Sequence, residues 1–445
     1  MSERRTGPPA GRRPVLLALA FFGIFIYGLI SALPGSVLPT LERSRYLPND
    51  SAVATFLLIN AVGALVAYLV SGPVIDRVGM KTALGGGALI AVLALAGFGL
   101  AVTKVAPAAA LGSIFICSLL LGLGANAVVS AGHALVAEIA AAGRNAALNL
   151  LDICFGLGLA ALPLAVQSIQ QRGGLGLVFT SMTVVTGLLV LGLLFAKFPR
   201  PAHPESVLSK EAGELLRTPS FWLLAAALFM YVGAEVSVGK WVVTFLERDA
   251  RLLAGAGLDA ARMGELARTS PDGLSAFFER DPAGVGVATY ALRTLSFFAF
   301  ALLAGRLASS LLLGVARVNS LILLTLGSAL TTAGLALAFT ADTGAGVRWW
   351  LVAAGFGMGP IFPTSVGLAS ALVPRIAGTA ISLVMAVGFA GLLVIPPAVG
   401  YISSAAGGAS GDVRTGLLAV VAASALMFLL HLALTLRGRA RARAR

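Results

Sequence analysis

GPVIDRVGMK, at residues 72–81, interrupts two long apolar runs with glycine and charge. We expect the first glycine to end an apolar helix and the aspartate and arginine to occupy a very short polar loop. The second glycine should turn the chain, and the lysine precedes the next helix. The residues concerned are Gly72, Asp76, Arg77, Gly79 and Lys81. This pattern is typical of a short loop between two membrane-spanning helices.

The rest of the chain is strongly apolar. Of its 445 residues, 58% are hydrophobic and 11% are charged, and the mean hydropathy is +0.94. One aqueous core cannot enclose that much apolar surface, so the composition predicts an all-α membrane protein. The formal charge of +13 would suggest nucleic acid in a soluble protein. Here the basic residues cluster in short loops and at the ends, which favours membrane topology and anionic lipid and predicts no nucleic-acid partner.

Apolar windows define the expected spans. A helix that crosses about 30 Å of hydrocarbon needs about 20 apolar residues. Twelve windows qualify, at 14–40, 51–75, 82–102, 107–138, 146–170, 175–197, 219–246, 286–310, 317–340, 346–372, 374–402 and 413–436. The first run is too long for the apolar part of a cleaved signal, so we expect an uncleaved span there.

Basic residues set the orientation. Nineteen Arg and Lys fall on the side of the N-terminus and eleven on the other, which predicts two cytoplasmic termini, as in a bacterial inner membrane. The expected parts are an N-terminal tail at 1–13, a six-helix half at 14–197, a linker at 198–218, a second six-helix half at 219–436 and a basic tail at 437–445. Residues 247–285 form a long extracytoplasmic loop, interpreted as a solvated cap.

Internal echoes indicate a duplication. The fourth and tenth windows both carry Gly-x-Gly, at Gly122 and Gly124 and at Gly355 and Gly357. The fifth and eleventh windows, and the first and seventh, also share short patterns in matching order. Such order supports two related six-helix halves, as in alternating-access transporters.

The opening stretch resembles the G-x-x-x-D-R-x-G-x-K loop motif of the major facilitator superfamily, and the second half keeps only Gly305 and Arg306 of a copy. Within that superfamily, the stretches 148–164, 231–246 and 355–369 resemble the fucose/proton symporter family and its glucose/galactose transporter relatives. The resemblance implies the major facilitator fold, with twelve transmembrane helices in two pseudo-symmetric six-helix halves. It also implies proton-coupled sugar transport, with a glutamate at the position of Glu235.

This chain departs from that family in its charged groups. Where the family's sugar symporters carry an acidic residue in the fourth span, the chain has Ala127, Val128 and Val129. His133 stands in place of an asparagine, and Asp152 in place of a neutral polar residue or histidine. The candidates for proton coupling are therefore sought among the chain's own ionisable groups.

Ionisable side chains inside spans cost upward of about 2.5 kcal/mol, so each is a functional candidate. His133 and Asp152 form either an inner titrating couple or a satisfied buried pair. Glu235 is either a mid-membrane proton or cation site or one half of a permanent salt bridge to Lys240 or Arg293. Lys240 and Arg293 either present positive charge to the solute or extend to the membrane interface.

Other polar and aromatic residues are candidate solute contacts. Trp241 either stacks on a sugar ring or anchors its helix at the interface. The remaining candidates either hydrogen-bond to sugar hydroxyls or join neighbouring helices. They are Tyr27, Asn60, Asn126 and Asn149.

Enzyme chemistry is not indicated. The segment GAEVSVGKW, at 233–241, has the wrong spacing for a phosphate-binding loop and no hydroxyl residue after the lysine. Cys117 and Cys154 fall in apolar runs, and three histidines have no metal spacing, so we expect neither a metal nor a cofactor.

The sequence predicts a monomeric secondary active transporter that imports a sugar or related small polar solute with a proton by alternating access. The solute is expected between the halves, near Glu235, Asn126, Asn149, Asp152, Lys240 and Arg293. One alternative is an exporter of organic anions or drugs by proton antiport. Another is a non-transporting receptor or scaffold that binds through 247–285. The motif at 72–81 is expected to act as a cytoplasmic latch in contact with neighbouring helix ends.

Overall fold

The computed structural model describes residues 13–139, 144–198, 215–255, 257, 277–278, 281–372, 377–407 and 412–443. Within these ranges the chain forms helices and short connections and no strand. The predicted tail at 1–13 lies almost wholly outside the described residues, and the predicted linker at 198–218 lies mostly outside them. Most of the predicted loop at 247–285 is outside them too.

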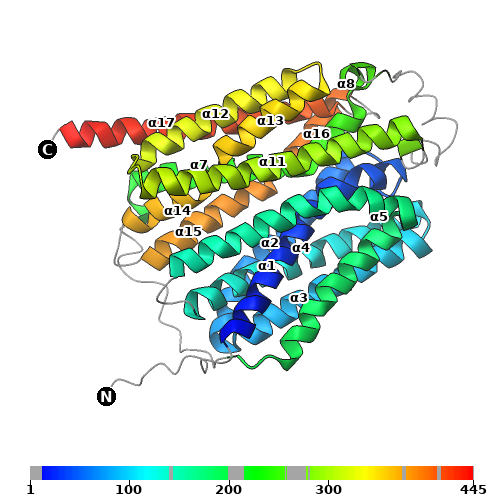
Figure 1. Ribbon diagram of the computed structural model, residues 1–445, viewed down its shortest axis with the longest axis horizontal. Helices are drawn as coiled ribbons and strands as arrows, with labels where there is room; N and C mark the ends of the chain where they lie inside the picture. The colour runs from blue at the N-terminus through cyan, green and yellow to red at the C-terminus, as the bar shows by residue number, and fades with distance from the viewer. Residues whose placement is uncertain are drawn as a thin grey trace. The chain divides into compact units, whose positions relative to one another are not determined.

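The predicted spans are confirmed as long apolar helices (Figure 1). They are α1 (Arg13–Arg43), α2 (Asp50–Arg77), α3 (Met80–Lys104), α4 (Pro107–Ile139), α5 (Arg144–Phe195), α7 (Pro219–Arg248), α11 (Pro282–Gly314), α12 (Ser320–Thr340), α13 (Gly344–Met358), α14 (Ile361–Leu372), α15 (Ala377–Ala390), α16 (Ile395–Gly407) and α17 (Val413–Arg443). A short helix, α8 (Ala250–Gly255), follows α7, and a 3₁₀ turn, η4 (Gly391–Leu393), separates α15 from α16.

Eleven membrane-length segments among the described residues correspond to the twelve predicted spans. The difference lies in α5, which runs through two predicted spans and has non-helical dihedral angles at Gly173 and Gly174. Gly174 has φ of 62°, a left-handed conformation that glycine adopts without steric cost. The chain turns there, so α5 contains both the fifth and the sixth span.

Two predicted spans are interrupted by proline. The tenth forms α13 and α14, with a break at Gly359 and Pro360, and the eleventh forms α15, η4 and α16, with Pro396 and Pro397 at the start of α16. Proline lacks a backbone N–H and clashes with the preceding turn, so a continuous helix is disfavoured at these points.

The chain divides into two compact units. The first contains Met1–Pro34 and Ile59–Glu205, and the second contains Gly35–Leu58 and Ser206–Arg445. In the first unit α3 packs against α4 and α5. In the second, α12 packs against α13 and α17, and α17 also packs against α7 (Figure 1). The C-terminal end of α1 and the N-terminal end of α2 therefore belong to the second unit.

In the first unit, the Gly-x-Gly pair of α4 permits close helix packing. A Cβ atom on Gly122 would lie 2.1 Å from the carbonyl oxygen of Asn60 in α2. One on Gly124 would lie 2.7 Å from the carbonyl oxygen of Gly87 in α3. Glycine is therefore needed where α4 meets each of these helices.

In the second unit, the Gly-x-Gly pair of α13 also permits close helix packing. A Cβ atom on Gly355 would lie 2.7 Å from the carbonyl oxygen of Phe298 in α11, and one on Gly357 would lie 2.7 Å from that of Gly327 in α12. The fourth span thus meets the second and third as the tenth meets the eighth and ninth. These matching contacts are what a duplication of a six-helix half predicts.

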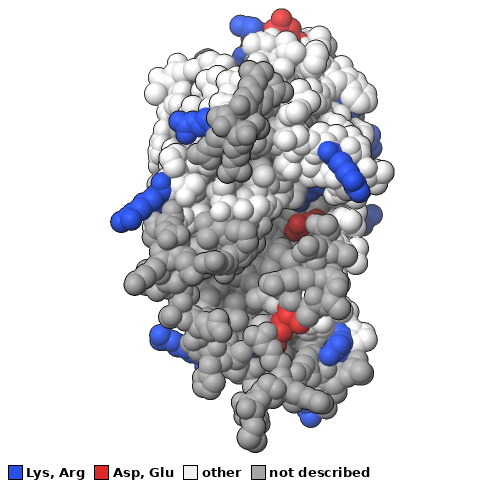
Figure 2. Space-filling view, turned by 90° about the vertical axis from the view of Figure 1, so that its left-hand side faces the viewer, with Lys and Arg blue, Asp and Glu red and all other residues white. Residues whose placement is uncertain are grey.

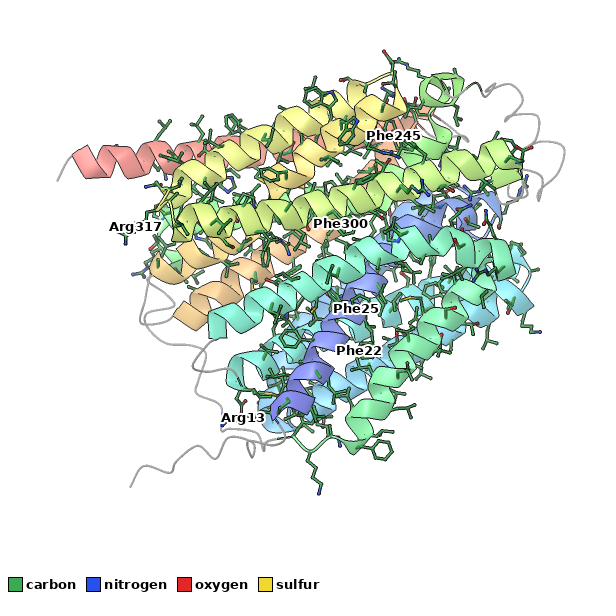
Figure 3. All side chains as sticks on the ribbon, in the orientation of Figure 1. Arg13, Phe22, Phe25, Phe245, Phe300 and Arg317 are labelled. Atoms are coloured by element: carbon green, nitrogen blue, oxygen red, sulfur yellow. The ribbon has the colours of Figure 1, made fainter. Side chains whose placement is uncertain are left out.

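The helices present apolar side chains outward as well as inward. Leu69, Phe195 and Trp349 are large, exposed hydrophobic residues. Phe300 of α11 is also exposed, whereas Phe245 of α7 is fully buried (Figure 3). Outward apolar side chains of this kind suit contact with lipid. Figure 2 looks onto ends of the helices, where described Lys and Arg side chains lie apart from one another.

Candidate functional site

A charged cluster in the second unit joins α7 to α11. Oε1 of Glu235 lies 3.9 Å from Nη2 of Arg306, and the two side chains are 15% and 16% exposed. Tyr231 lies one turn before Glu235 on α7, and its ring faces Phe362 of α14 with 6.4 Å between centroids. This cluster combines an acid, a base and a phenol with an aromatic wall.

The ion-pair partner of Glu235 is neither of the two cations that the sequence analysis named for a salt bridge. Its ion pair is with Arg306 rather than with Lys240 or Arg293. Lys240 is buried on α7, and Arg293 is exposed on α11. Arg306 lies inside a predicted apolar window but was assigned to a motif copy at a loop. Its place in that window was the signal that marks it as an intramembrane charge.

Trp241 is fully buried, so neither of its two expected roles fits this arrangement. Its indole Nε1 donates a hydrogen bond to the carbonyl oxygen of Pro396, 2.9 Å away. A sugar ring cannot stack on a side chain without exposed surface. The contact instead joins α7 to the first turn of α16.

A neutral polar cluster in the first unit centres on Asn126 of α4. Its Oδ1 accepts hydrogen bonds from the hydroxyls of Tyr27, at 3.1 Å, and Tyr68, at 3.0 Å. Its Nδ2 donates to the carbonyl oxygen of Gly122, at 2.8 Å. The ring of Tyr27 stacks on Phe155 of α5 with 5.4 Å between centroids. Tyr68 was not among the candidates, because an isolated tyrosine in an apolar window carries no motif.

Asn60 and Asn149 differ in what the structure describes. Nδ2 of Asn60 donates to the carbonyl oxygen of Ser118, 2.9 Å away, so in this arrangement it joins α2 to α4. This corresponds to the interhelical alternative. Asn149 lies on α5, and its side chain is outside the described residues.

His133 and Asp152 lie together, on α4 and α5. Nε2 of His133 is 3.4 Å from Oδ1 of Asp152, and both side chains are 38% exposed. Nδ1 of the same ring lies 2.8 Å from the carbonyl oxygen of Val129. A ring that donates through Nδ1 can bond Asp152 through Nε2 only if His133 is doubly protonated or Asp152 carries a proton. A bonded couple therefore contains a titratable proton.

The motif at 72–81 corrects the expectation about where α2 ends. The helix continues through Gly72 and Pro73 and ends at Arg77, so the first glycine does not end it. Asp76 and Arg77 lie in its last turn rather than on a loop. A Cβ atom on Gly72 would meet nothing within 4 Å, so this glycine serves no close contact within the described residues. The side chain of Asp76 is outside the described set.

The second part of the motif forms the turn. Gly79 has φ of 115°, which lies in the region that favours glycine, and it precedes α3. Nζ of Lys81 donates to the carbonyl oxygens of Leu194, at 3.0 Å, and Ala196, at 2.9 Å. These carbonyls end α5, and a cation there is favoured by both hydrogen bonding and the helix dipole.

Among the described residues, no group of three or more His, Cys, Asp or Glu side chains is arranged to hold a metal ion. Cys117 and Cys154 are both free thiols.

A profile of the Major Facilitator Superfamily matches residues 20–262. Among curated proteins, the chain is 25% identical over 265 residues to "Bypass of stop codon protein 6" of Saccharomyces cerevisiae. The match covers 54% of this chain and 51% of that protein, so the chain spans about half the length of this relative.

Several solved structures share the fold. The nucleoside transporter NupG is 14% identical, with a TM-score of 0.70 and coverage of 95% of this chain and 98% of that one. A bacterial homolog of the human lysosomal transporter Spinster is 16% identical, with a TM-score of 0.69 and coverage of 95% and 98%. A D-xylose–proton symporter is 14% identical, with a TM-score of 0.68 and coverage of 94% and 97%.

Proposed function

Because the chain belongs to the major facilitator superfamily, we propose that it is a secondary active transporter that moves a hydroxyl-rich polar solute with a proton by alternating access. A sugar or a sugar-containing compound is the solute that fits the side chains best, and the proposed direction is import. The proposal rests on one ion pair, between Glu235 and Arg306, and is supported by the neutral polar cluster around Asn126.

The ion pair between Glu235 and Arg306 is long. At 3.9 Å the two atoms are within ion-pair range but too far apart for a good hydrogen bond. The pair therefore has electrostatic attraction without the full hydrogen-bond energy of a close carboxylate–guanidinium contact. A proton on Glu235 would cancel the attraction and leave the guanidinium of Arg306 to donate to a solute oxygen. Solute binding and protonation of Glu235 would then favour each other.

The neutral cluster supplies groups of the kind that bind hydroxyls. Tyr27 and Tyr68 have donor and acceptor hydroxyls, and Asn126 has an amide with both functions. Their hydrogen bonds to one another can be exchanged for bonds to a solute hydroxyl without leaving a buried polar atom unpaired. Phe155 stacks on the ring of Tyr27, which limits the movement of the phenol.

Two structural neighbours agree with this solute class. Their titles name a nucleoside transporter and a D-xylose–proton symporter. Nucleosides and xylose both carry several hydroxyls on a sugar ring. At 14% identity these neighbours establish the fold, and the solute class rests on the side chains of this chain.

An acidic solute is the second candidate, because Arg306 is a guanidinium next to a carboxylate that can be displaced. Lys240 and Arg293 support an acidic solute less strongly than the sequence analysis predicts. Arg293 is exposed, whereas Lys240 is buried. A solute with a carboxylate would compete directly with Glu235 for Arg306. A proton on Glu235 would favour both candidates, so the chemical class of the ligand separates them rather than the direction of the pH effect.

A thermal-shift screen separates these candidates. The purified full chain is heated with monosaccharides, nucleosides and sugar acids at acidic and alkaline pH. A ligand at about a hundred times its Kd stabilises the folded protein by about 2.7 kcal/mol. We expect neutral sugars or nucleosides to stabilise the protein more strongly at the acidic pH, because the solute and a proton are proposed to bind together.

Two variants make the screen specific. Arg306→Lys keeps the charge but removes the planar fork of donors, so it should lose most of the ligand shift. Asp342→Asn, in an exposed ion pair with Arg251, should keep it. Stabilisation by sugar acids alone would favour the anion alternative, and an unchanged shift in Arg306→Lys would refute the proposed site.

A further inference from the structure

A second charged cluster lies within the second unit, where the ends of α1 and α2 meet α7. It consists of Glu42, Arg43, Asp50, Glu247 and Arg248. Arg43 pairs with Glu247, and both side chains are at least nine-tenths buried. Nη1 of Arg248 donates to Oε1 of Glu42, at 3.0 Å, and to Oδ1 of Asp50, at 2.5 Å. The cluster is separate from Glu235 and Arg306.

Backbone contact sets the position of this cluster. A Cβ atom on Gly35 of α1 would lie 1.8 Å from the carbonyl oxygen of Gly239 in α7. One on Gly400 of α16 would lie 2.6 Å from the carbonyl oxygen of Asp50. Helices in such close contact fix their side chains with little freedom, so the carboxylates cannot simply move apart.

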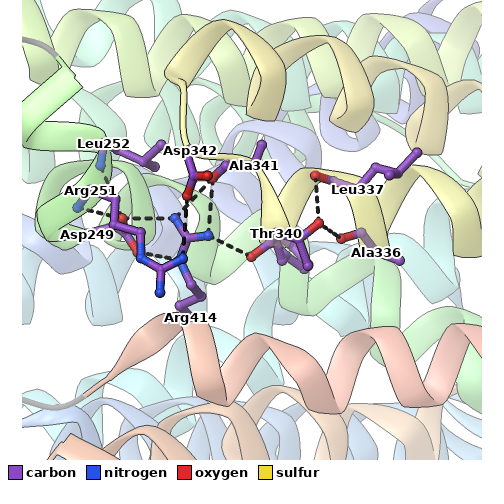
Figure 4. A network of polar contacts seen from close by, with 10 residues as sticks. Asp249, Arg251, Leu252, Ala336, Leu337, Thr340, Ala341, Asp342 and Arg414 are labelled. Carbon is purple, nitrogen blue, oxygen red and sulfur yellow. Dashed lines mark hydrogen bonds and ion pairs between the residues drawn. The ribbon is translucent and has the colours of Figure 1, made fainter.

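The cluster has one negative charge more than its basic groups balance. Three carboxylates face two guanidiniums. The neighbouring Asp249 is matched by Arg414, which bonds both of its carboxylate oxygens at 2.6 and 2.9 Å (Figure 4). Lys240 lies two helical turns before Glu247, about 10 Å along α7, which is too far for a direct pair. The additional charge is therefore local to the cluster.

Glu42 and Asp50 both accept a hydrogen bond from Nη1 of Arg248. Asp50 is almost completely buried, and its Oδ2 also accepts a hydrogen bond from Ser403 of α16. Glu42 is nine-tenths buried, and its Oε2 has no hydrogen-bond partner among the described residues. Two buried carboxylates at one donor repel each other, so a single proton between them is favoured.

We propose that Glu42 and Asp50 form a proton-binding site that is complete only when the ends of α1 and α2 lie against α7 and α16. The proton comes from water and forms an O–H bond at Oε2 of Glu42, the oxygen that otherwise lacks a donor. It leaves the cluster with two negative and two positive charges. When these helix ends separate, both carboxylates reach water, and the proton returns to solvent.

This site adds a proton-linked step to the transport cycle, and only that step rests on the proposed function. The predicted topology places the cluster at the extracytoplasmic side. Separation of α1 and α2 from α7 would open that side and release the proton there. Proton binding itself is a property of the assembled cluster and needs no solute.

Infrared spectroscopy tests the site directly. Spectra of the full chain are recorded at neutral and alkaline pH in the region of the carbonyl stretch of protonated carboxylic acids. We expect a protonated-acid band at neutral pH in the parent protein and in Asp342→Asn, whose carboxylate is exposed. Glu42→Gln should lose that band because it removes the proton acceptor, and Asp50→Asn should lose it because it removes the competing charge.

Stability provides the second measurement. Glu42→Gln keeps an acceptor for Arg248 and mimics the protonated charge, so it should fold. The assembled cluster binds a proton, so its contribution to stability is present at lower pH and lost as pH rises. The parent should therefore unfold at a lower temperature at alkaline than at neutral pH, and Glu42→Gln should show a smaller difference.

Two results would overturn the proposal. One is a protonated-acid band of equal size in the parent, Glu42→Gln and Asp50→Asn. The other is an alkaline loss of stability that Glu42→Gln leaves unchanged. Neither measurement involves transport, so a failure of this site is distinguishable from a failure of the proposed solute site.

Discussion

His133 and Asp152 show what a single pair of side chains contributes at the residue scale. The geometry places Nε2 and Oδ1 3.4 Å apart while Nδ1 contacts the carbonyl oxygen of Val129. We therefore expect the two residues to behave as one coupled pair rather than as two independent groups. Their proximity could be predicted from the sequence, because His133 lies near the end of α4 and Asp152 near the start of α5, at similar depths of consecutive spans.

Variants of this couple should be non-additive. His133→Gln and Asp152→Asn should each shift the pH dependence of transport, and the double variant should shift it less than the sum of the two. We expect a coupling of at least about 0.5 kcal/mol, as for residues in direct contact. The measurement is the pH midpoint of solute-driven current for the parent and three variants. Additive shifts would mean that the residues titrate independently.

In the ion pair between Glu235 and Arg306, the sequence indicated the acid as a candidate site residue but did not indicate the arginine. Glu235 stood out because a carboxylate inside an apolar window is costly. Arg306 lay in such a window too, yet its neighbour Gly305 suggested a degenerate loop motif. Which cation faces which anion depends on how α7 and α11 are rotated about their axes, and hydropathy does not contain that rotation.

At the element scale, helix packing depends on glycines at defined positions. Gly122 and Gly355 occupy equivalent places on α4 and α13, and each lies against the backbone of a neighbouring helix. The sequence revealed the repeated Gly-x-Gly and its order. The contacts themselves could not be predicted, because which helix each glycine faces depends on three-dimensional packing.

Alanine at either position should destabilise the fold. The added Cβ would lie 2.1 Å from the carbonyl oxygen of Asn60 in Gly122→Ala and 2.7 Å from that of Phe298 in Gly355→Ala. We expect a loss of about 1–3 kcal/mol for each, as for other overpacked interiors. Gly85→Ala in α3 is the control, because a Cβ there meets nothing within 4 Å. Denaturation in detergent measures all three, and equal stability would refute the packing argument.

The motif lysine gives a second prediction for helix ends. Lys81 bonds the carbonyl oxygens of Leu194 and Ala196, so Lys81→Met should reduce stability by about 0.5–1 kcal/mol. Arg77→Met, at an exposed position, is the matched control. Thermal unfolding compares the two variants. Equal effects would show that Lys81 acts only through its charge, without a contribution from these hydrogen bonds.

At the scale of the whole molecule, composition and hydropathy were sufficient for the fold. Twelve apolar windows correspond to the described spans once α5 is divided at Gly173 and Gly174. The windows did not show that α1 extends to Arg43 or that α2 extends to Arg77. Hydropathy windows end at charged residues, so the cluster around Glu42 could not be predicted from them.

The central claim is that protonation of Glu235 is coupled to movement of a hydroxyl-rich solute. Its most direct test is the transient current of proteoliposomes on a solid-supported membrane when a monosaccharide or nucleoside is added. The account predicts a current in the parent and in Asp342→Asn that disappears in Glu235→Gln, while Glu235→Gln still exchanges labelled solute. A current in Glu235→Gln equal to that of the parent would contradict it.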